Sequence, residues 1–483
     1  MNSVACFKTP RLISTSLLAL AALAVALVGI AIPALAQGFV YDFPTNTGAP
    51  VFPNGALAQG RDGNLYGIAL DAWSVSQGGA IYRITPSGTE GGVYVLPNDG
   101  SQGFNCYPGL TLGTDGNFYG ACVQSATGYG TVFSVTPDGT FNLLHTFSNG
   151  TDGEVPYGPP VEGTDGNFYG VTYGNGSGIP GGTVYKITPS GTLTTVHTFS
   201  LDGNGTNPQG PLFVGSDGNF YGTTSAGGSG GYGSVFKMTA KGKITVVHSF
   251  TETSTDGGTP QSGVIQAADG SFYGATFRGG TSNEGTLFKV TAAKKFTLLH
   301  SFDLAPDYGI YPAQPVVQAT DGNIYGVATS YASGGYANNG SVYKMGTTKK
   351  GTFSVVFEFG SGPGNQVPVP DSPLLTHTNG LMYGSTDEGG PTTSGTVYSV
   401  NQGLQPFITI QTKSGKVGTS VNILGQGFNS ATSVAFNGTA AIFSVVSDTF
   451  MTATIPSGST TGFVTVAEPG GTLKSNFKFK VKP

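Results

Sequence analysis

Short apolar and aromatic runs of six to eight residues recur along most of the chain, separated by turns rich in Gly, Pro, Asn and Asp. One stretch holds four of them in succession, at residues 210–215, 219–225, 234–239 and 243–250. Runs of this length between turn residues predict β-strands, and the Asp-Gly pair between the first two predicts a hairpin with both turn residues at positive φ. No segment offers a capped helical period of ten or more residues. The pattern therefore predicts an all-β protein.

The predicted strands are arranged in repeats. The motif DGNxYG, or a variant of it, occurs seven times, and successive copies start 50 to 58 residues apart. Four strands per copy at a fixed period of this length are typical of a β-propeller blade. Many strands are apolar on both faces, as expected for a sheet packed between two others. The copies start at Asp62, Asp115, Asp165, Asp217, Asp269, Asp321 and, as NGLMYG, Asn379.

The two ends of the repeat region predict how the ring closes. Residues 38–43 (GFVYDF) resemble the fourth strand of a repeat, such as residues 196–199 (VHTF), whereas the seventh repeat has only three strands. A leading strand that completes the last sheet would hide both sheet edges, which otherwise invite aggregation. We therefore expect residues 37–402 to form a seven-bladed β-propeller closed by its N-terminal strand.

Residues 403–483 follow a different pattern. The DGNxYG motif is missing from them, and about seven short predicted strands alternate with turns. This number and spacing of strands is typical of an Ig-like β-sandwich. The sequence therefore predicts a separate C-terminal domain.

The first 36 residues read as an export signal. Lys8 and Arg11 precede an apolar run over residues 17–32, and Ala34-Leu35-Ala36 supplies a small-x-small cleavage site. This arrangement predicts a signal peptide cut after Ala36, although the run is nearly long enough for a retained membrane anchor. We expect a secreted, extracellular or periplasmic protein with no membrane span after cleavage.

The charge and the hydrophobic content of the sequence exclude some classes of protein. With 21 basic residues against 26 acidic ones, the net charge of −5 argues against nucleic-acid binding. The 38% hydrophobic content and 10% charged content also exclude a disordered, highly charged tail.

Two longer stretches resemble known families. GGTVYKITPSG (181–191) and TLTTVHTFS (192–200) are similar to the tandem Gloeo/Verruco-type (GloVer) repeat of secreted bacterial proteins, and the likeness extends over most of residues 38–402. GKVGTSVNILGQGF (415–428) and GFVTVAEPGG (462–471) resemble an IPT/TIG domain. The resemblance implies no enzyme activity and no particular ligand.

Cys106 and Cys122 are the two cysteines that remain after signal cleavage, and they lie in one repeat. In an oxidising compartment they are expected either to form a local disulfide or to stay as two buried thiols.

Binding residues are expected on the long loops between second and third strands and on the crossings between repeats, because these loops differ in every copy. Aromatic side chains there suit stacking on sugar rings, although they could equally shield the ends of the sheets. These candidates are Trp73, Tyr129, Tyr157, Tyr232, Tyr308, Tyr311, Tyr331 and Tyr336.

Acidic loop residues are the candidates for catalysis. Asp387 and Glu388 lie in the seventh repeat, and Asp71 lies in the first, which ring closure would make its neighbour. Two carboxyl groups that flank a sugar can support glycosidic cleavage, although adjacent exposed acids are more often simply solvated. Residues 202–206 (DGNGT) are the best calcium candidate, and a weak one, so no cofactor is expected.

No metal site is expected from the histidines. His145, His197, His248 and His300 occupy one position in four different repeats, so they cannot converge on one ion. We therefore expect an exported non-enzymatic binding or scaffold protein that contacts a carbohydrate polymer or another surface protein through its loop face. The alternative is a polysaccharide-active hydrolase or lyase.

Overall fold

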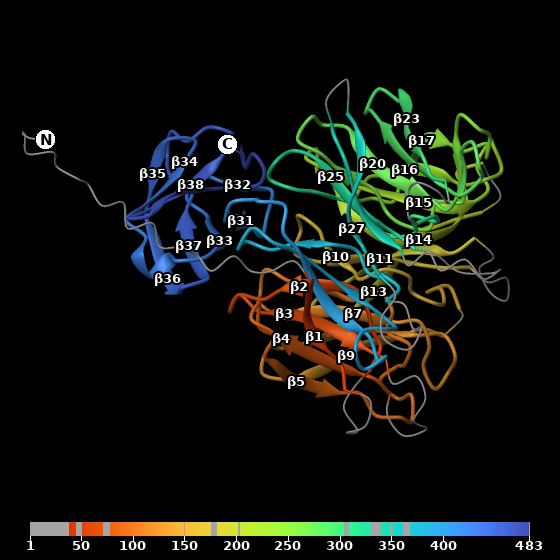
Figure 1. The fold of residues 1–483 in the computed structure, drawn as a ribbon, viewed down its shortest axis with the longest axis horizontal. Coiled ribbons are helices and arrows are strands. Elements are labelled where there is room, and N and C mark those ends of the chain that lie inside the picture. Colours follow the sequence, from red (N-terminus) through yellow and green to blue (C-terminus); the bar gives the residue numbers. More distant parts are fainter. Residues whose placement is uncertain are drawn as a thin grey trace, which may run out of the picture. The chain divides into compact units, whose positions relative to one another are not determined.

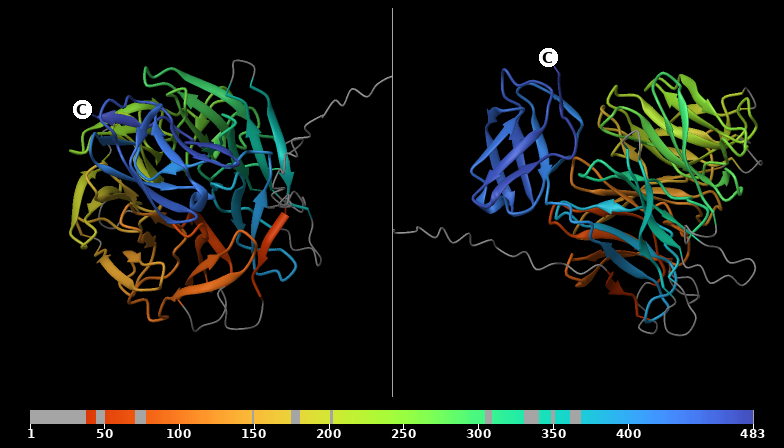
Figure 2. Two further views of the ribbon diagram at one scale, coloured as in Figure 1. Left: turned by 90° about the vertical axis from the view of Figure 1, so that its left-hand side faces the viewer. Right: turned by 45° about the horizontal axis from the view of Figure 1, so that its top comes forward.

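The computed structural model describes residues 38–44, 51–70, 78–148, 150–174, 181–200, 203–303, 309–329, 340–347, 351–360 and 368–482. These residues are almost entirely β-structure, with one short 3-10 turn, η1 (Phe428–Ser430). Figure 1 shows the strands in chain order, and Figure 2 adds two further views. The fold is all-β and propeller-like in the repeat region.

Four-stranded antiparallel sheets follow one another in chain order through the first four repeats. Their strands are β2 (Pro53–Gln59), β3 (Leu65–Ala69), β4 (Ala80–Ile84) and β5 (Glu90–Val95); β6 (Leu110–Leu112), β7 (Phe118–Cys122), β8 (Thr131–Val135) and β9 (Phe141–Thr146); β10 (Val161–Glu162), β11 (Phe168–Thr172), β12 (Thr183–Ile187) and β13 (Leu193–Thr198); and β14 (Thr206–Val214), β15 (Phe220–Ala226), β16 (Ser234–Met238) and β17 (Ile244–Ser249).

The next two repeats form sheets of the same kind, and a two-stranded ribbon accompanies the fifth. The strands are β19 (Ile265–Gln266), β20 (Phe272–Thr276), β22 (Thr286–Val290) and β23 (Phe296–Ser301); β24 (Val317–Gln318), β25 (Ile324–Ala328), β26 (Ser341–Met345) and β27 (Phe353–Glu358); and, in the ribbon, β18 (Gly257–Gly258) and β21 (Arg278–Gly279).

The sheet of the seventh repeat contains the first strand of the chain. Its order is β1-β30-β29-β28, formed by β1 (Gly38–Asp42), β30 (Thr396–Val400), β29 (Met382–Thr386) and β28 (Leu375–Thr376). β1 runs antiparallel to β30, with Asp42 opposite Thr396. Just after β1, Phe43 is only 2% exposed, and its ring packs edge-on against Tyr82 of β4, with the centroids 5.1 Å apart.

The DGNxYG motif forms the turn between the first two strands of each sheet. In the first copy, the Gly60 N–H donates to the Asn64 carbonyl and the Gly63 N–H donates to the Gly60 carbonyl. The expectation of two residues at positive φ is wrong, because among the turn residues only the motif glycine has a positive φ, 77° at Gly63. This pattern is a three-residue loop, a type I turn followed by one left-handed residue.

The aspartate and the tyrosine of the motif are linked by a hydrogen bond at the same turn. In the first six copies the tyrosine hydroxyl donates to the motif aspartate at 2.8 to 3.0 Å. In the third to sixth copies, a lysine from the third strand pairs with the same carboxylate at 2.7 to 3.3 Å.

Aromatic rings pack between neighbouring sheets. Tyr66 stacks on Phe118 of the next repeat at 4.1 Å, and Tyr119 stacks on Phe168 at 3.6 Å. The second strands that carry these tyrosines, such as β3 and β7, are buried along their whole length. Burial on both faces explains their continuous apolar sequence.

The C-terminal domain holds two four-stranded sheets and a short parallel pair. Its core includes Ile423, Phe436, Met451 and Val466. The sequence did not predict three of its short strands, β32, β35 and β39. The strands are β31 (Thr409–Ile410), β33 (Ser420–Leu424), β37 (Phe450–Thr454) and β36 (Phe443–Ser447); β35 (Thr439–Ala441), β34 (Ser433–Phe436), β38 (Val464–Glu468) and β39 (Gly471–Lys474); and β32 (Ser414–Lys416) with β40 (Lys480–Lys482).

Candidate functional site

A pocket of about 600 Å³ is lined by residues from all seven repeats. One position of the repeat lines it in every copy, eight residues before the first residue of the DGNxYG motif. The residue at this position varies between copies, from amide to aromatic to carboxylate. In chain order these residues are Asn54, Tyr107, Tyr157, Gln209, Gln261, Ala313 and Asp371.

The backbone just before this position is constrained in the same way in most copies. Two residues ahead of the lining residue, six copies have a non-glycine residue at a positive φ of 51° to 64°, including Val155 and Thr259. A left-handed conformation costs a non-glycine residue about 1–3 kcal/mol and is concentrated at functional sites. These six residues are Phe52, Asn105, Val155, Asn207, Thr259 and Tyr311.

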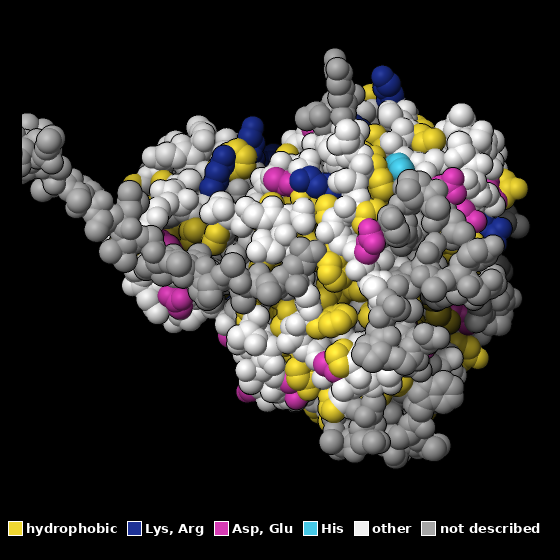
Figure 3. Space-filling view, in the orientation of Figure 1, with side chains coloured by type: hydrophobic (Ala, Val, Ile, Leu, Met, Phe, Trp, Pro, Cys, Tyr) yellow, Lys and Arg dark blue, Asp and Glu magenta, His cyan; other side chains and the backbone are white. Residues whose placement is uncertain are grey.

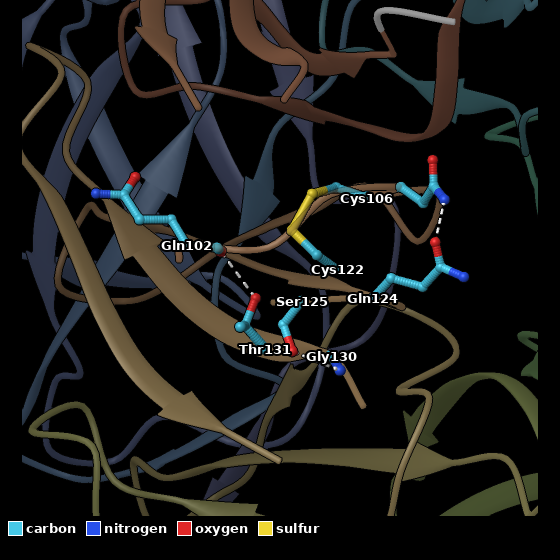
Figure 4. The surroundings of a disulfide bond; sticks show 8 residues. Gln102, Cys106, Cys122, Gln124, Ser125, Gly130 and Thr131 are labelled. Atoms are coloured by element: carbon cyan, nitrogen blue, oxygen red, sulfur yellow. Dashed lines mark hydrogen bonds between the residues drawn. A yellow bond between two sulfur atoms is a disulfide. The ribbon is translucent and has the colours of Figure 1, made fainter. Parts of the chain in front are cut away.

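The residue directly before the lining position is Pro in six copies and Cys106 in the second. Cys106 is bonded to Cys122 at the end of β7, and Figure 4 shows this disulfide. A proline fixes its own φ, and the disulfide ties the segment to the neighbouring strand. The proline and the disulfide both restrict the backbone next to the pocket-lining residue that follows.

Aromatic rings from several repeats line the pocket. Tyr107 and Tyr157 line it and are 39% and 38% exposed, respectively. Burial raises the pKa of Tyr157, and Tyr173, Tyr107 and Asp371 raise it further. These shared electrostatic interactions place Tyr107 and Asp371 near the Tyr157 hydroxyl. Phe277 also lines the pocket and stacks on Tyr311, with the ring centroids 4.5 Å apart.

Carboxyl groups of the seventh repeat form another part of the pocket lining. Asp371 precedes β28 and Asp387 follows β29, and the pairing of Pro370 with Thr386 brings the two together. Gln314 Nε2 donates to Asp371 Oδ1 at 2.9 Å, and Asn54 Nδ2 approaches Oδ2 at 3.4 Å. Burial raises the pKa of Asp371 despite these amide donors.

Asp387, like Asp371, has a raised pKa. Burial raises its pKa to about 7, and the negative charges of Asp371 and Glu388 add to the effect. Its Oδ1 atom is buried and has no hydrogen-bond partner. Among the described residues that line the pocket there is no Lys, Arg or His. A proton therefore stays on this group up to near-neutral pH.

The structure brings some of the predicted site residues together. Tyr157, Asp387 and Glu388 line the pocket, and Tyr311 stacks behind Phe277. Asp71, Trp73, Tyr308, Tyr331 and Tyr336 lie outside the described residues.

Two other predicted residues do not line the pocket. Tyr129 packs against the buried cluster around Tyr119 and Phe147. Tyr232 is 44% exposed elsewhere on the repeat region. Exposure alone therefore did not identify the pocket side chains.

Sequence reasoning missed Tyr107 and Asp371, together with the amides Asn54, Gln209 and Gln261. A signal for them was present, because their position changes identity from copy to copy while proline precedes it in six copies. Aligning the repeats of this one chain at that position would have found all seven.

No metal centre emerges from the described residues, among which no group of three His, Cys, Asp or Glu could hold an ion. The best calcium candidate of the sequence includes Asp202, which lies outside the described part of the chain. His145 and His248 instead pair with Asp152 and Asp256, both at 3.0 Å. Within the described residues, no helix is both long and apolar enough to cross a bilayer.

Family comparisons identify both parts of the chain. The Gloeobacter/Verrucomicrobia repeat matches residues 52–267 and 252–441. The IPT/TIG domain matches residues 406–481. No curated protein matches the sequence.

Several solved structures are similar at low identity. A streptogramin B lyase is 14% identical with a TM-score of 0.49, and the match covers 74% of this chain and 96% of that one. A luciferin-regenerating enzyme is 13% identical (TM-score 0.39, 62% and 92% covered). Regucalcin from Agrobacterium tumefaciens, a calcium-binding protein, is 12% identical (TM-score 0.36, 67% and 94% covered). Likenesses this weak carry no information about ligand or activity.

Proposed function

The chain belongs to the Gloeobacter/Verrucomicrobia repeat family and carries a C-terminal IPT/TIG domain. We propose that it is an exported binding protein whose repeat region binds a carbohydrate polymer. In this proposal the repeats form a seven-bladed propeller closed by the N-terminal strand. The mature protein begins at Gln37 and acts outside the cytoplasm.

Contacts between the last and first repeats support the closed ring. Thr378, next to the seventh motif, accepts a hydrogen bond from Gln59 at 2.7 Å. His377 donates from Nε2 to the Gly63 carbonyl at 2.9 Å. β1 belongs to the seventh sheet, while Phe43 packs on Tyr82 of the first. Seven sheets in one ring would also account for a pocket lined by residues from all seven repeats.

The mixture of groups in the pocket is the observation that carries the carbohydrate proposal. Tyr107 and Tyr157 offer partly exposed ring faces, on which the apolar face of a sugar can stack. Amides such as Gln209 and Gln261 can both donate to and accept from hydroxyl groups. The volume lies within the roughly 300–1,000 Å³ of ligand pockets. A concave site of this size fits a sugar chain better than the flat surface of another protein.

Charged side chains are sparse on the face of the molecule shown in Figure 3. This agrees with the 10% of charged residues in the sequence as a whole.

A second candidate function rests on Asp387 alone. A carboxyl group that keeps its proton near pH 7 is suited to act as a general acid, and Asp371 beside it would be the second carboxyl of a glycosidase pair. Release of shorter oligosaccharides by the wild-type protein, lost in Asp387→Asn, would establish this activity.

A glycan array probed with the purified mature protein tests the binding proposal. We expect Tyr157→Ala to weaken binding to the best glycan about two- to tenfold, since one aromatic contact is worth about 0.5–1.5 kcal/mol. The matched control is Tyr232→Ala, which removes an equally exposed tyrosine outside the pocket. Equal loss in both variants, or no glycan bound by the wild-type protein, would contradict the proposal.

A further inference from the structure

The carboxyl groups that line the pocket offer a basis for selection among carbohydrates. Resting on the proposed function, we propose that Asp371 and Asp387 form a subsite for the ammonium group of an amino sugar within the bound chain. The neighbouring rings of the same chain would pack against Tyr107 and Tyr157.

Within the described part of the chain, the charges that raise the pKa of Asp387 are both negative. Asp371 lies beside it across the β28–β29 pair, and Glu388 follows it in the chain. The nearest polar groups on the adjoining repeats, Asn54 and Gln314, are neutral amides, and their donors are directed at Asp371. A positively charged group on the ligand is the partner that this arrangement lacks.

Asp387 Oδ1 is a hydrogen-bond acceptor to which none of the described residues donates. The atom is shielded from solvent. A buried acceptor without a donor costs free energy, and that cost is recovered when a ligand supplies a donor. An ammonium group carries three N–H donors and a charge, so it can serve Asp387 and Asp371 together.

The protonation state of Asp387 is consistent with this assignment. No Lys, Arg or His lies among the described residues that line the pocket, and burial together with the neighbouring acids keeps a proton on Asp387 up to about pH 7. An ammonium ion in the same place favours the ionised carboxylate, so the proton is released to solvent when the ligand binds.

The rest of the pocket favours a sugar over a simple amine. Tyr107 and Tyr157 offer stacking faces, and Gln209 and Gln261 offer partners for hydroxyl groups. A polyamine or a lysine side chain would leave the amide groups without partners. A glucosamine ring carries the ammonium, the hydroxyls and the apolar face at once.

Calorimetry on the mature protein tests the subsite with three probes at pH 6, where Asp387 keeps its proton and most amino groups of the ligand are ammonium ions. We expect the β-1,4-linked hexamer of glucosamine to bind at least tenfold more tightly than the hexamer of N-acetylglucosamine, with release of protons on binding. Asp387→Asn, which keeps the shape and removes the charge, should abolish that preference. Asp138→Asn, a change at a fully exposed aspartate outside the pocket, should preserve it.

Three other outcomes would contradict the subsite, the assignment to a sugar or the proposed function. Equal affinity for the two hexamers would overturn the ammonium subsite and leave carbohydrate binding intact. Equal affinity for pentalysine would overturn the assignment to a sugar. Failure of both hexamers and of all glycans on the array would overturn the proposed function itself.

Discussion

At the scale of single residues, the seventh repeat buries two titratable groups whose pKa values are shifted in opposite directions. Burial lowers the pKa of His377 to about 4, whereas it raises that of Asp387 to about 7. The neutral His377 ring makes two hydrogen bonds with backbone groups. Its Nε2–H donates to the Gly63 carbonyl, and its Nδ1 accepts from the Asn379 N–H at 3.1 Å. Protonation at Nδ1 would break the second bond.

Acid should therefore destabilise the protein through His377. Between about pH 6.5 and pH 4 the unfolded chain binds a proton at this ring and the folded protein does not, so stability falls as pH decreases through this window. The full loss is about 3 kcal/mol. In urea unfolding at pH 4.5 and pH 7.5, His377→Gln should lower stability at pH 7.5 but lose less than the wild type between the two pH values. An unchanged difference would contradict this account.

At the scale of elements, a single segment of the repeat positions the pocket side chains. It combines a residue at positive φ with a following Pro, as in Val155-Pro156, before the lining residue Tyr157. The second repeat has Cys106 in place of the proline and bonds it to Cys122. The same position is thus held by a rigid ring in six copies and by a covalent link in one.

Removal of the disulfide should cost measurable stability. The two cysteines are 16 residues apart in sequence, and closing a loop of this size is worth about 3 kcal/mol. We expect Cys106→Ser with Cys122→Ser to lower the free energy of unfolding by that amount, and reductant to do the same to the wild type. Cys106→Pro with Cys122→Ala should recover about 0.4–1 kcal/mol, because Pro occupies this position in the other copies. A midpoint of urea unfolding that is the same in all four samples would contradict this interpretation.

At the scale of the whole molecule, the repeat region depends on pairing between its two ends. β1 joins the sheet of the seventh repeat, and Phe43 reaches the first. Equivalent rings make the same contact between other neighbours, such as Phe147 with Tyr185 and Phe250 with Phe288. The contact at the ends of the repeat region therefore repeats the contact found between adjacent sheets.

Loss of this contact should weaken the entire repeat region. Phe43→Ala is expected to cost about 3–5 kcal/mol of unfolding free energy, because the ring is 2% exposed. Phe39→Ala is the control in the preceding strand, since its ring is 48% exposed and should matter little. Thermal unfolding of the two variants gives the comparison. Equal melting temperatures would show that the leading strand does not contribute to the fold.

The sequence by itself determined most of the strands, the repeat and the change of pattern at the C-terminal domain, because these depend on local features: apolar runs, Asp-Gly turns and a fixed period. It also located Tyr157, Asp387 and Glu388, which stand on variable loops. It did not identify the left-handed residues, such as Val155 and Thr259, that precede five of the six prolines, because φ depends on how tightly neighbouring backbones pack.

Only the tertiary structure decided which side chains share a pocket. Asn54 and Asp371 meet across 317 residues of chain, through contacts between the first and last repeats. The pKa of Asp387 likewise depends on burial and on Asp371, and neither can be read from the residues next to it. Long-range packing fixes distance and desolvation, and these two quantities determine what a carboxyl group can bind.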